Sequence, residues 1–318
     1  MIDFRYHVVS IVAVFLALAL GLFLGSTTLQ DAVVHSLKNN TDRVTRENKS
    51  LDAHVSALEA QARLATNFDK ELLPYAVSGR LNGQQITVVS APGASDSVRK
   101  QLFTTLQQAG ATVTADIRLQ SSLVDPKQGA FLRSLAQHLN VAGDPAQPSA
   151  DGAALAVGQL AAVLGQRPAA RDVTPATIDT VLSTYKAAKV VTVANTTPTT
   201  RPGTLAVVLA GAAPSAGTDP AAVTAEHTVL VEMLRDLDVT AVGAVLAAPV
   251  PTPGSGPDVL SFAANANGLI RAAATVTGID TPQGQIATVF ALAAQLGGVS
   301  GQYGLRPGEP LPSATSTP

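Results

Sequence analysis

An uncharged apolar run from Val8 to Gly25 stands near the start of the chain. A helix needs about 20 residues, or roughly 17 at the least, to cross a hydrocarbon layer of about 30 Å. The apolar core of a cleavable signal peptide spans only about 7–15 residues and precedes a cleavage site of small residues. Because only Gly25-Ser26-Thr27 offers such a site after the run, we expect a retained membrane anchor over residues 8–25 rather than a signal peptide.

The segment before this run favours one orientation in the membrane. Arg5 lies in the head, residues 1–7, while Lys38 and Arg43 follow the anchor, so the distribution of positive charge does not decide the orientation. A head this short is easily left in the cytoplasm while the remainder is exported. We therefore expect a single-pass protein of the cell membrane, with its N-terminus inside and its bulk extracytoplasmic.

A second apolar pattern follows the anchor and repeats every 3.5 residues. Its positions are spaced alternately three and four residues apart, and neither glycine nor proline occurs between Asp31 and Leu73. This spacing predicts a coiled-coil stalk over residues 29–73. We call the repeating positions the seam: Val34, Leu37, Thr41, Val44, Asn48, Leu51, Val55, Leu58, Ala62 and Ala65.

The seam is the predicted partner-binding surface. The residues expected to contact a partner are Val34, Leu37, Val44, Asn48, Leu51, Val55 and Leu58. Asn48 occupies an a position, where asparagine fixes register and strand number. The seam is weak, and a parallel homodimer would also place Glu47 opposite Asp52 of the second copy. Self-association and docking of a partner's helix both remain open, beside an isolated amphipathic helix that folds back on the rest of the chain.

Two glycines in the anchor, Gly21 and Gly25, form a G-x-x-x-G pair. Small residues at this spacing let two membrane helices approach each other closely. We therefore expect these residues to take part in helix association within the membrane.

From residue 83 the pattern alternates short β-rich runs with amphipathic helices. A strand over 86–92, a helix opened by Ser95 or Asp96 and a strand over 111–119 make a βαβ unit. Because the strands are apolar on both faces, we predict an α/β sandwich around a parallel sheet over residues 83–304. The other expected elements are helices over 126–140, 151–165, 174–189, 220–237, 257–265 and 282–296, strands over 204–212, 243–248 and 274–277, an exposed loop over 196–203 and a disordered tail over 305–318.

Composition removes several function classes. The chain has no cysteine and two methionines, which excludes a thiolate nucleophile, an iron–sulfur cluster and a zinc–thiolate site. Its net charge of −2 gives no basic surface for nucleic acid, so no nucleic-acid partner is expected.

The sequence contains no recognisable catalytic constellation. The loop over 91–97, APGASDS, matches neither G-x-G-x-x-G nor a P-loop, so we expect a helix cap there rather than an anion site. The five histidines form no H-x-x-x-H pair. We expect Asp236 and Asp238 in a solvated turn at a helix end, and Asp280 in helix-start electrostatics. The predicted protein is therefore not an enzyme and has no cofactor, although a glycan or nucleotide-like ligand in the crevice of the sheet remains an alternative.

Motifs at both ends of the chain carry a resemblance. The start reads RYHVVS and VAVFLALALGLFLGS, and the end reads GIDTPQGQIATVFALAAQLGG and GQYG. With the intervening coiled coil, this order resembles the MctB family of actinobacteria. The resemblance implies an envelope protein of copper resistance, in a family proposed to form pores for copper efflux across the outer membrane. Similar proteins of the SteB type are associated with cell separation, where the coiled coil docks a cell-wall hydrolase and the membrane segment links to a cytoplasmic partner.

The residues themselves favour a scaffold within this family. Copper carriage ordinarily uses cysteine, methionine and clustered histidine, which this chain almost lacks, and Gln302 stands where family members carry histidine. We therefore expect a non-enzymatic, membrane-anchored envelope protein whose partners are membrane lipid and a second helix. The alternative is a SteB-like regulator that docks and activates a cell-wall hydrolase. Copper is implied by the resemblance alone.

Overall fold

The computed structural model describes residues 4–139, 141, 151–167, 173–194, 201–265, 273–306 and 308–310. The chain divides into two compact units, Met1–Ala65 and Thr66–Pro318. The first unit is part of one long helix, and the second contains the end of that helix and the α/β domain.

A single helix, α1 (Phe4–Val77), contains both N-terminal segments that the apolar patterns predict. Its residues Tyr6–Gly25 have a mean hydropathy of 2.8 and none of them is buried, so this stretch is long and apolar enough to cross a membrane. The helix continues past the stalk boundary expected at residue 73, and Pro74 lies in its last turn.

The domain is built on a seven-stranded sheet in the order β3-β2-β1-β4-β5-β6-β7. The predicted α/β fold is confirmed, and every strand pair is parallel except β2 with β3, so the sheet is mixed where the sequence predicted a parallel one. The strands are β1 (Gln85–Ser90), β2 (Thr112–Leu119), β3 (Val191–Ala194), β4 (Leu205–Leu209), β5 (Gly243–Ala248), β6 (Ala274–Thr277) and β7 (Gln302–Gly304). Residues of β4 and β5 are buried throughout, as expected for parallel strands covered on both faces.

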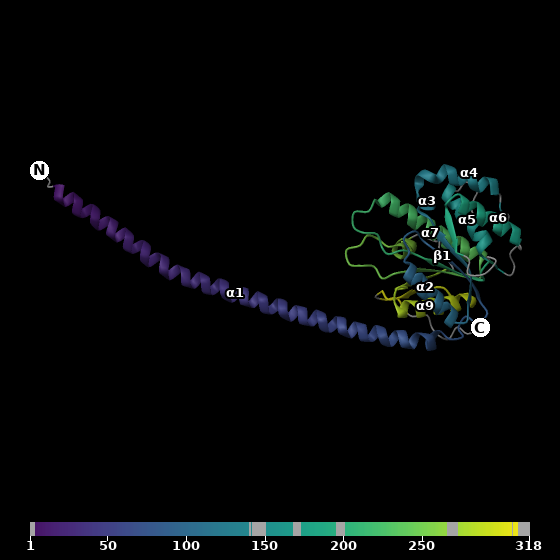
Figure 1. Ribbon diagram of the computed structural model, residues 1–318, viewed down its shortest axis with the longest axis horizontal. Helices are drawn as coiled ribbons and strands as arrows, with labels where there is room; N and C mark the ends of the chain where they lie inside the picture. Colours follow the sequence, from purple (N-terminus) through teal and green to yellow (C-terminus); the bar gives the residue numbers. More distant parts are fainter. Residues whose placement is uncertain are drawn as a thin grey trace. The chain divides into compact units, whose positions relative to one another are not determined.

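Helices cover both faces of the sheet, as Figure 1 shows. One face carries α2 (Asp96–Gln108) and α9 (Pro282–Leu296), which pack on a cluster that includes Val88 and Val207. Among the described residues, the other face carries six helices around Val89 and Val208, while the end of α1 packs in the first cluster through Leu73 and Val77. The six helices are α3 (Ser121–Val124), α4 (Gly129–Leu139), α5 (Gly152–Leu164), α6 (Pro175–Ala187), α7 (Pro220–Thr240) and α8 (Val259–Asn265), with a short 3₁₀ turn at Pro126–Gln128 before α4.

Side chains at the helix starts explain several boundaries. Asp151 Oδ1 accepts from Ala154 N at the start of α5, and the hydroxyls of Thr174 and Thr281 accept from backbone N–H groups in the first turns of α6 and α9. Ser95 precedes α2 as expected, but its hydroxyl contacts Ser97 instead of capping the helix.

The connections reverse direction between β1 and β4. The chain passes from β1 through α2 to β2, and from β4 through α7 to β5 on the opposite side of the sheet. In such sheets a crevice opens beyond the carboxyl ends of the two strands at this switch point. The loops that follow β1 and β4 therefore face a shared space.

Two segments expected to be irregular form specific contacts. The predicted loop over 196–203 is described from residue 201 onward, and its Gly203 pairs with Gly165 after α5. In the predicted tail, Arg306 forms an ion pair with Asp258 at the start of α8. Residues 196–200 and 311–318 lie outside the described residues.

Candidate functional site

The seam lies on α1 with its described apolar side chains exposed. Exposed fractions range from 47% to 67% for Leu37, Val44, Leu51, Val55 and Leu58, and Asn48 is exposed as well. The side chain of Val34 lies outside the described part of the structure. Since Leu and Val are usually buried, a regular row of exposed ones marks a surface that a second element can cover.

Short-range polar contacts stabilise α1 beside the seam. Arg43 forms an ion pair with Glu47 at 3.1 Å, and Arg63 forms one with Glu59 at 3.6 Å, each one turn apart. Thr41 donates its hydroxyl proton to the carbonyl of Leu37 at 2.9 Å. Exposed pairs of this kind contribute about 0.3–0.5 kcal/mol each to helix stability. Both ion pairs join residues beside the seam, so they leave its apolar side chains available for packing.

The glycine pair in the apolar stretch also lies on an open surface. A Cβ atom built on Gly21 or Gly25 would meet nothing within 4 Å among the described residues. The two glycines are one helical turn apart on the same side of α1. They form a smooth strip that a second helix can approach.

The last three turns of α1 carry an apolar strip that the heptad pattern did not predict. Leu73 and Val77 are buried against the domain, and Gln283 donates a hydrogen bond to Asp69. In contrast, Phe68 and Tyr75 are 67% and 83% exposed. Phe68 and Tyr75 are seven residues apart, a spacing that indicates an apolar helix face. The predicted stalk ended at residue 73, between these two residues, so the face was not recognised.

A crevice of about 660 Å³ occupies the switch point between β1 and β4. Loops that follow β1 and β4 line it, together with α3, the 3₁₀ turn after α3 and the first two turns of α7. Pro92, Pro126 and Pro214 supply apolar walls, and the charged residues in the lining are Asp125 and Glu226, both acidic. The described lining contains no lysine or arginine.

Two neighbouring residues of α7, Glu226 and His227, bring ionisable groups to this crevice. Burial raises the pKa of Glu226, which is half-buried. None of the hydrogen bonds and ion pairs found among the described residues involves its carboxylate. Burial also lowers the pKa of His227, although the charge of Asp258 opposes the change. The His227 ring packs on Phe262, with 5.5 Å between the ring centroids. His227 looked isolated in the sequence, because Asp125 and Asp258 are distant along the chain and come near it only in the folded domain.

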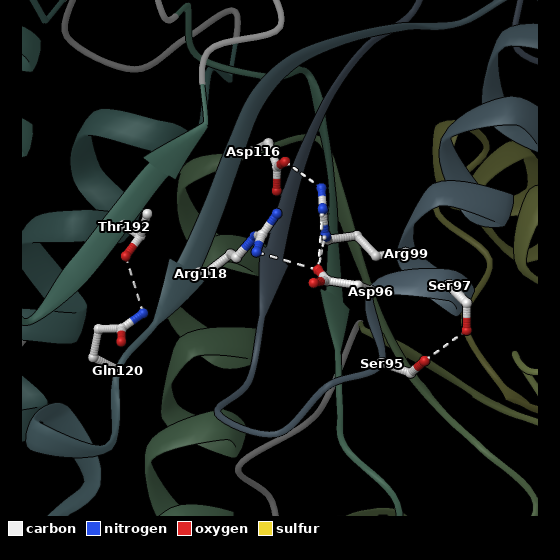
Figure 2. A network of polar contacts seen from close by, with 8 residues as sticks. All are labelled: Ser95, Asp96, Ser97, Arg99, Asp116, Arg118, Gln120 and Thr192. Atoms are coloured by element: carbon white, nitrogen blue, oxygen red, sulfur yellow. Dashed lines mark hydrogen bonds and ion pairs between the residues drawn. The ribbon is translucent and has the colours of Figure 1, made fainter.

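A charged network lies between β2 and α2 (Figure 2). Arg99 on α2 forms a buried ion pair with Asp116 on β2. Arg99 and Arg118 also each contact Asp96 at 3.2 Å. Burial raises the pKa of Asp116 against the charge of Arg99, whereas the hydrogen bond from Arg99 and the charge of Arg118 lower the pKa of Asp96.

The network also contains buried polar atoms with unused hydrogen-bonding capacity. Asp116 Oδ1, Ser90 Oγ and Arg118 Nε have no hydrogen-bond partner in the described part of the chain. Because Asp96 occupies the first turn of α2, the arginines there are already neutralised.

The sequence-based expectation for Asp236 and Asp238 needs correction. Asp236 and Asp238 lie inside α7 instead of a solvated turn, and Asp236 is 1% exposed and paired with Arg235. Burial raises the pKa of both carboxyls. Asp280 accepts a hydrogen bond from Val250 N at 3.1 Å, so it connects the loop after β5 to the start of α9.

The histidines do not assemble a metal site in the described structure. His7, His35 and His54 are exposed along α1, and His138 contacts its own helix through Ser134 O. Among the described residues, no three His, Cys, Asp or Glu side chains come together as a group that could hold a metal ion.

Comparison with known proteins identifies the family. The model of the family described as "Copper transport outer membrane protein, MctB" matches residues 1–312. The chain is 33% identical over 135 residues to proteins named Copper transporter MctB from Mycobacterium tuberculosis and Mycobacterium bovis, and 32% identical to that of Mycobacterium leprae. Each matched segment covers 42% of this chain and 43% of the relative. Since the family model extends over nearly the whole sequence, the chain belongs to the MctB family.

Proposed function

We propose that this chain is a non-enzymatic scaffold of the cell envelope, anchored in a membrane by residues 6–25 and joined to a second helix through the seam. The observation that carries the proposal is the row of exposed apolar side chains on α1 at 3.5-residue spacing. Full burial of one leucine or valine side chain contributes about 1.5–3 kcal/mol, so covering these five residues favours association, although the ordering cost of association offsets part of the gain.

The composition of the seam suggests that this association is weak and adjustable. Thr41 and Asn48 replace apolar residues at two a positions, and each lowers the apolar area that a partner can cover. In a parallel pair of copies, Glu47 would lie opposite Asp52 of the second copy. A partner's helix without this repulsion would bind more tightly, which is the basis of the SteB-like alternative, in which the stalk docks a cell-wall hydrolase.

A role in copper homeostasis follows from the family and not from a resident site. The relatives are named copper transporters. In this chain no cysteine is present, and the described residues bring no metal-ligating group together. We therefore propose that the chain supports copper homeostasis by organising other envelope components, with the N-terminus inside the cell.

The seam is tested by a matched pair of double variants. Leu51→Glu with Leu58→Glu places two carboxylates in the seam, whereas Ala53→Glu with Ala60→Glu places two on the opposite side of the same turns, where the residues are also exposed. In membranes, cross-linking of the full chain to itself or to a partner should fall at least tenfold for the leucine variant and stay unchanged for the alanine variant.

The same variants distinguish the two biological readings. In a deletion strain, growth in excess copper and chaining of cells are scored after complementation with each variant. Loss of copper tolerance alone supports the copper-related scaffold, and chaining alone supports the hydrolase-docking alternative. Full complementation by the leucine variant would refute the proposed role of the seam.

A further inference from the structure

The crevice at the switch point has the chemistry of a small-molecule site. Its volume of about 660 Å³ lies within the range of about 300–1,000 Å³ that is usual for such sites. It opens beyond the carboxyl ends of β1 and β4, where the chain leaves the two strands toward opposite faces of the sheet, the position at which doubly wound sheets bind ligands. This site is separate from the seam on α1 and does not depend on the function proposed above.

Four polar side chains of the crevice offer acceptors to a ligand, those of Ser122, Asp125, Thr218 and Glu226, and Ser121, Gln128 and His227 in the same lining can donate. Ser122 donates its hydroxyl proton to Lys189 O, and Thr218 donates its proton to Ser215 O, each at 2.8 Å. Only lone pairs of these hydroxyls then remain for a ligand. The carboxylate of Glu226 is also an acceptor and has no partner among the described residues, so a ligand rich in donors would satisfy the site.

The charges around the crevice disfavour an anionic ligand. Helix starts normally attract anions, but three aspartates already occupy the starts of the neighbouring helical segments. Asp96 lies in the first turn of α2, Asp125 accepts from Lys127 N before the 3₁₀ turn, and Asp219 accepts from Ala221 N at the start of α7. The described lining itself contains two carboxylates and no lysine or arginine.

We infer that the crevice binds a cationic, hydroxyl-rich ligand of one or two sugar rings, an amino sugar by chemical class. Its ammonium group pairs with Glu226, and its hydroxyl groups donate to the lone pairs of Ser122 and Thr218. The apolar C–H face of a ring packs on the proline walls at Pro92, Pro126 and Pro214. A phosphorylated sugar or a nucleotide is rejected, because its phosphate would lie beside unpaired carboxylate charge.

Calorimetry of the full chain in detergent tests this inference with three probes of similar size. Glucosamine carries the ammonium group, glucose lacks it, and glucose 6-phosphate carries negative charge instead. We expect the affinity for glucosamine to exceed that for glucose at least fivefold, and we expect no measurable heat with glucose 6-phosphate.

Two isosteric variants locate the effect. Glu226→Gln removes the unpartnered carboxylate and should lower the affinity for glucosamine at least tenfold. Glu232→Gln changes a carboxyl on the same helix, whose pKa burial also raises and which does not line the crevice, and it should leave the affinity within twofold.

Three results would overturn the inference. They are the absence of glucosamine binding at millimolar concentration by the folded chain, equal or tighter binding of glucose 6-phosphate, and equal effects of the two glutamine variants. Because none of these measurements involves helix association, failure here leaves the proposed function of the seam unaffected.

Discussion

At the scale of single residues, the domain depends on charges that are buried in pairs. The Arg99–Asp116 pair joins α2 to β2, and both side chains are less than a tenth exposed. Asp116 in a buried strand was a visible signal in the sequence, but its partner lies 17 residues away on another element. Only the folded chain shows that the carboxylate is neutralised.

Replacing Arg99 tests this dependence. Arg99→Met leaves Asp116 buried without its main counter-charge, and loss of one partner of a buried pair costs about 3–5 kcal/mol. Hydrogen exchange of peptides over residues 85–119 in the full chain should accelerate accordingly. Asp96→Asn is the control, because Asp96 is exposed and solvent screens its ion pairs. Equal exchange in both variants would contradict the assigned role of the buried pair.

The buried carboxyl of Asp236 gives a pH-dependent prediction. Burial raises its pKa above the ordinary value of 3.8, with Arg235 opposing, so the native state holds the proton more tightly than the unfolded state does. This contribution to stability is present below pH 3.8 and is lost as the pH rises through the raised pKa.

The control for this prediction is Asp236→Asn, which has no carboxyl to titrate. Between pH 3.8 and the raised pKa, wild-type chain should lose stability relative to the variant, and the difference should then become constant. Urea unfolding followed by tyrosine fluorescence measures it, since Tyr185 is fully buried. A constant difference over the whole range would show that Asp236 is not perturbed.

At the scale of elements, close backbone contacts position the helices on the sheet. A Cβ atom on Gly284 would lie 1.9 Å from Gly278 O, because the first turn of α9 contacts the loop after β6 directly. Thr281 caps this turn by accepting from Gly284 N at 3.1 Å. The contact explains why glycine occupies a helical position where alanine would otherwise be favoured.

Alanine substitution tests this contact. Gly284→Ala must displace α9 or the loop, and overpacking of this kind costs about 1–3 kcal/mol. Gly129→Ala is the matched control, because a Cβ there meets nothing within 4 Å and its backbone is already helical. Urea unfolding should show a loss for Gly284→Ala and no loss for the control. A neutral Gly284→Ala variant would mean that α9 is not held by this approach.

Local patterns predicted most elements but not those that depend on neighbours. Apolar periodicity indicated the helices correctly, because this signal lies within a few residues, and the structure shows caps such as Asp151 and Thr174. The strands β3 and β7 were missed, since four and three residues with partly exposed side chains carry little signal of their own. Their existence depends on pairing with β2 and β6.

The candidate sites divide in the same way. The seam is a property of one helix and was visible from spacing alone. The crevice with Glu226 in its wall could not be predicted, because it results from two loops, α3, the 3₁₀ turn and α7 meeting at one edge of the sheet. The sequence indicated that such a crevice would exist, but it could not identify the side chains in it.

At the scale of the whole molecule, the chain combines a copper-related family with a sequence poor in copper ligands. We predict that calorimetry of the full chain with Cu²⁺ gives only the heat of dilution. Lys49→His with Ala53→His provides a positive control, because it creates two histidines one turn apart on an exposed stretch of α1. Tight binding by the unmodified chain would contradict the scaffold proposal and indicate a site outside the described residues.

The short outer strands of the sheet have a consequence for handling the protein. An exposed edge strand is a template on which other chains can pair and aggregate, and many proteins avoid this by keeping their edge strands short. Here β3 and β7 offer only four and three residues. The domain should therefore not seed irreversible fibrils in concentrated solutions. Assemblies that do form there should be joined through α1 and should dissociate on dilution.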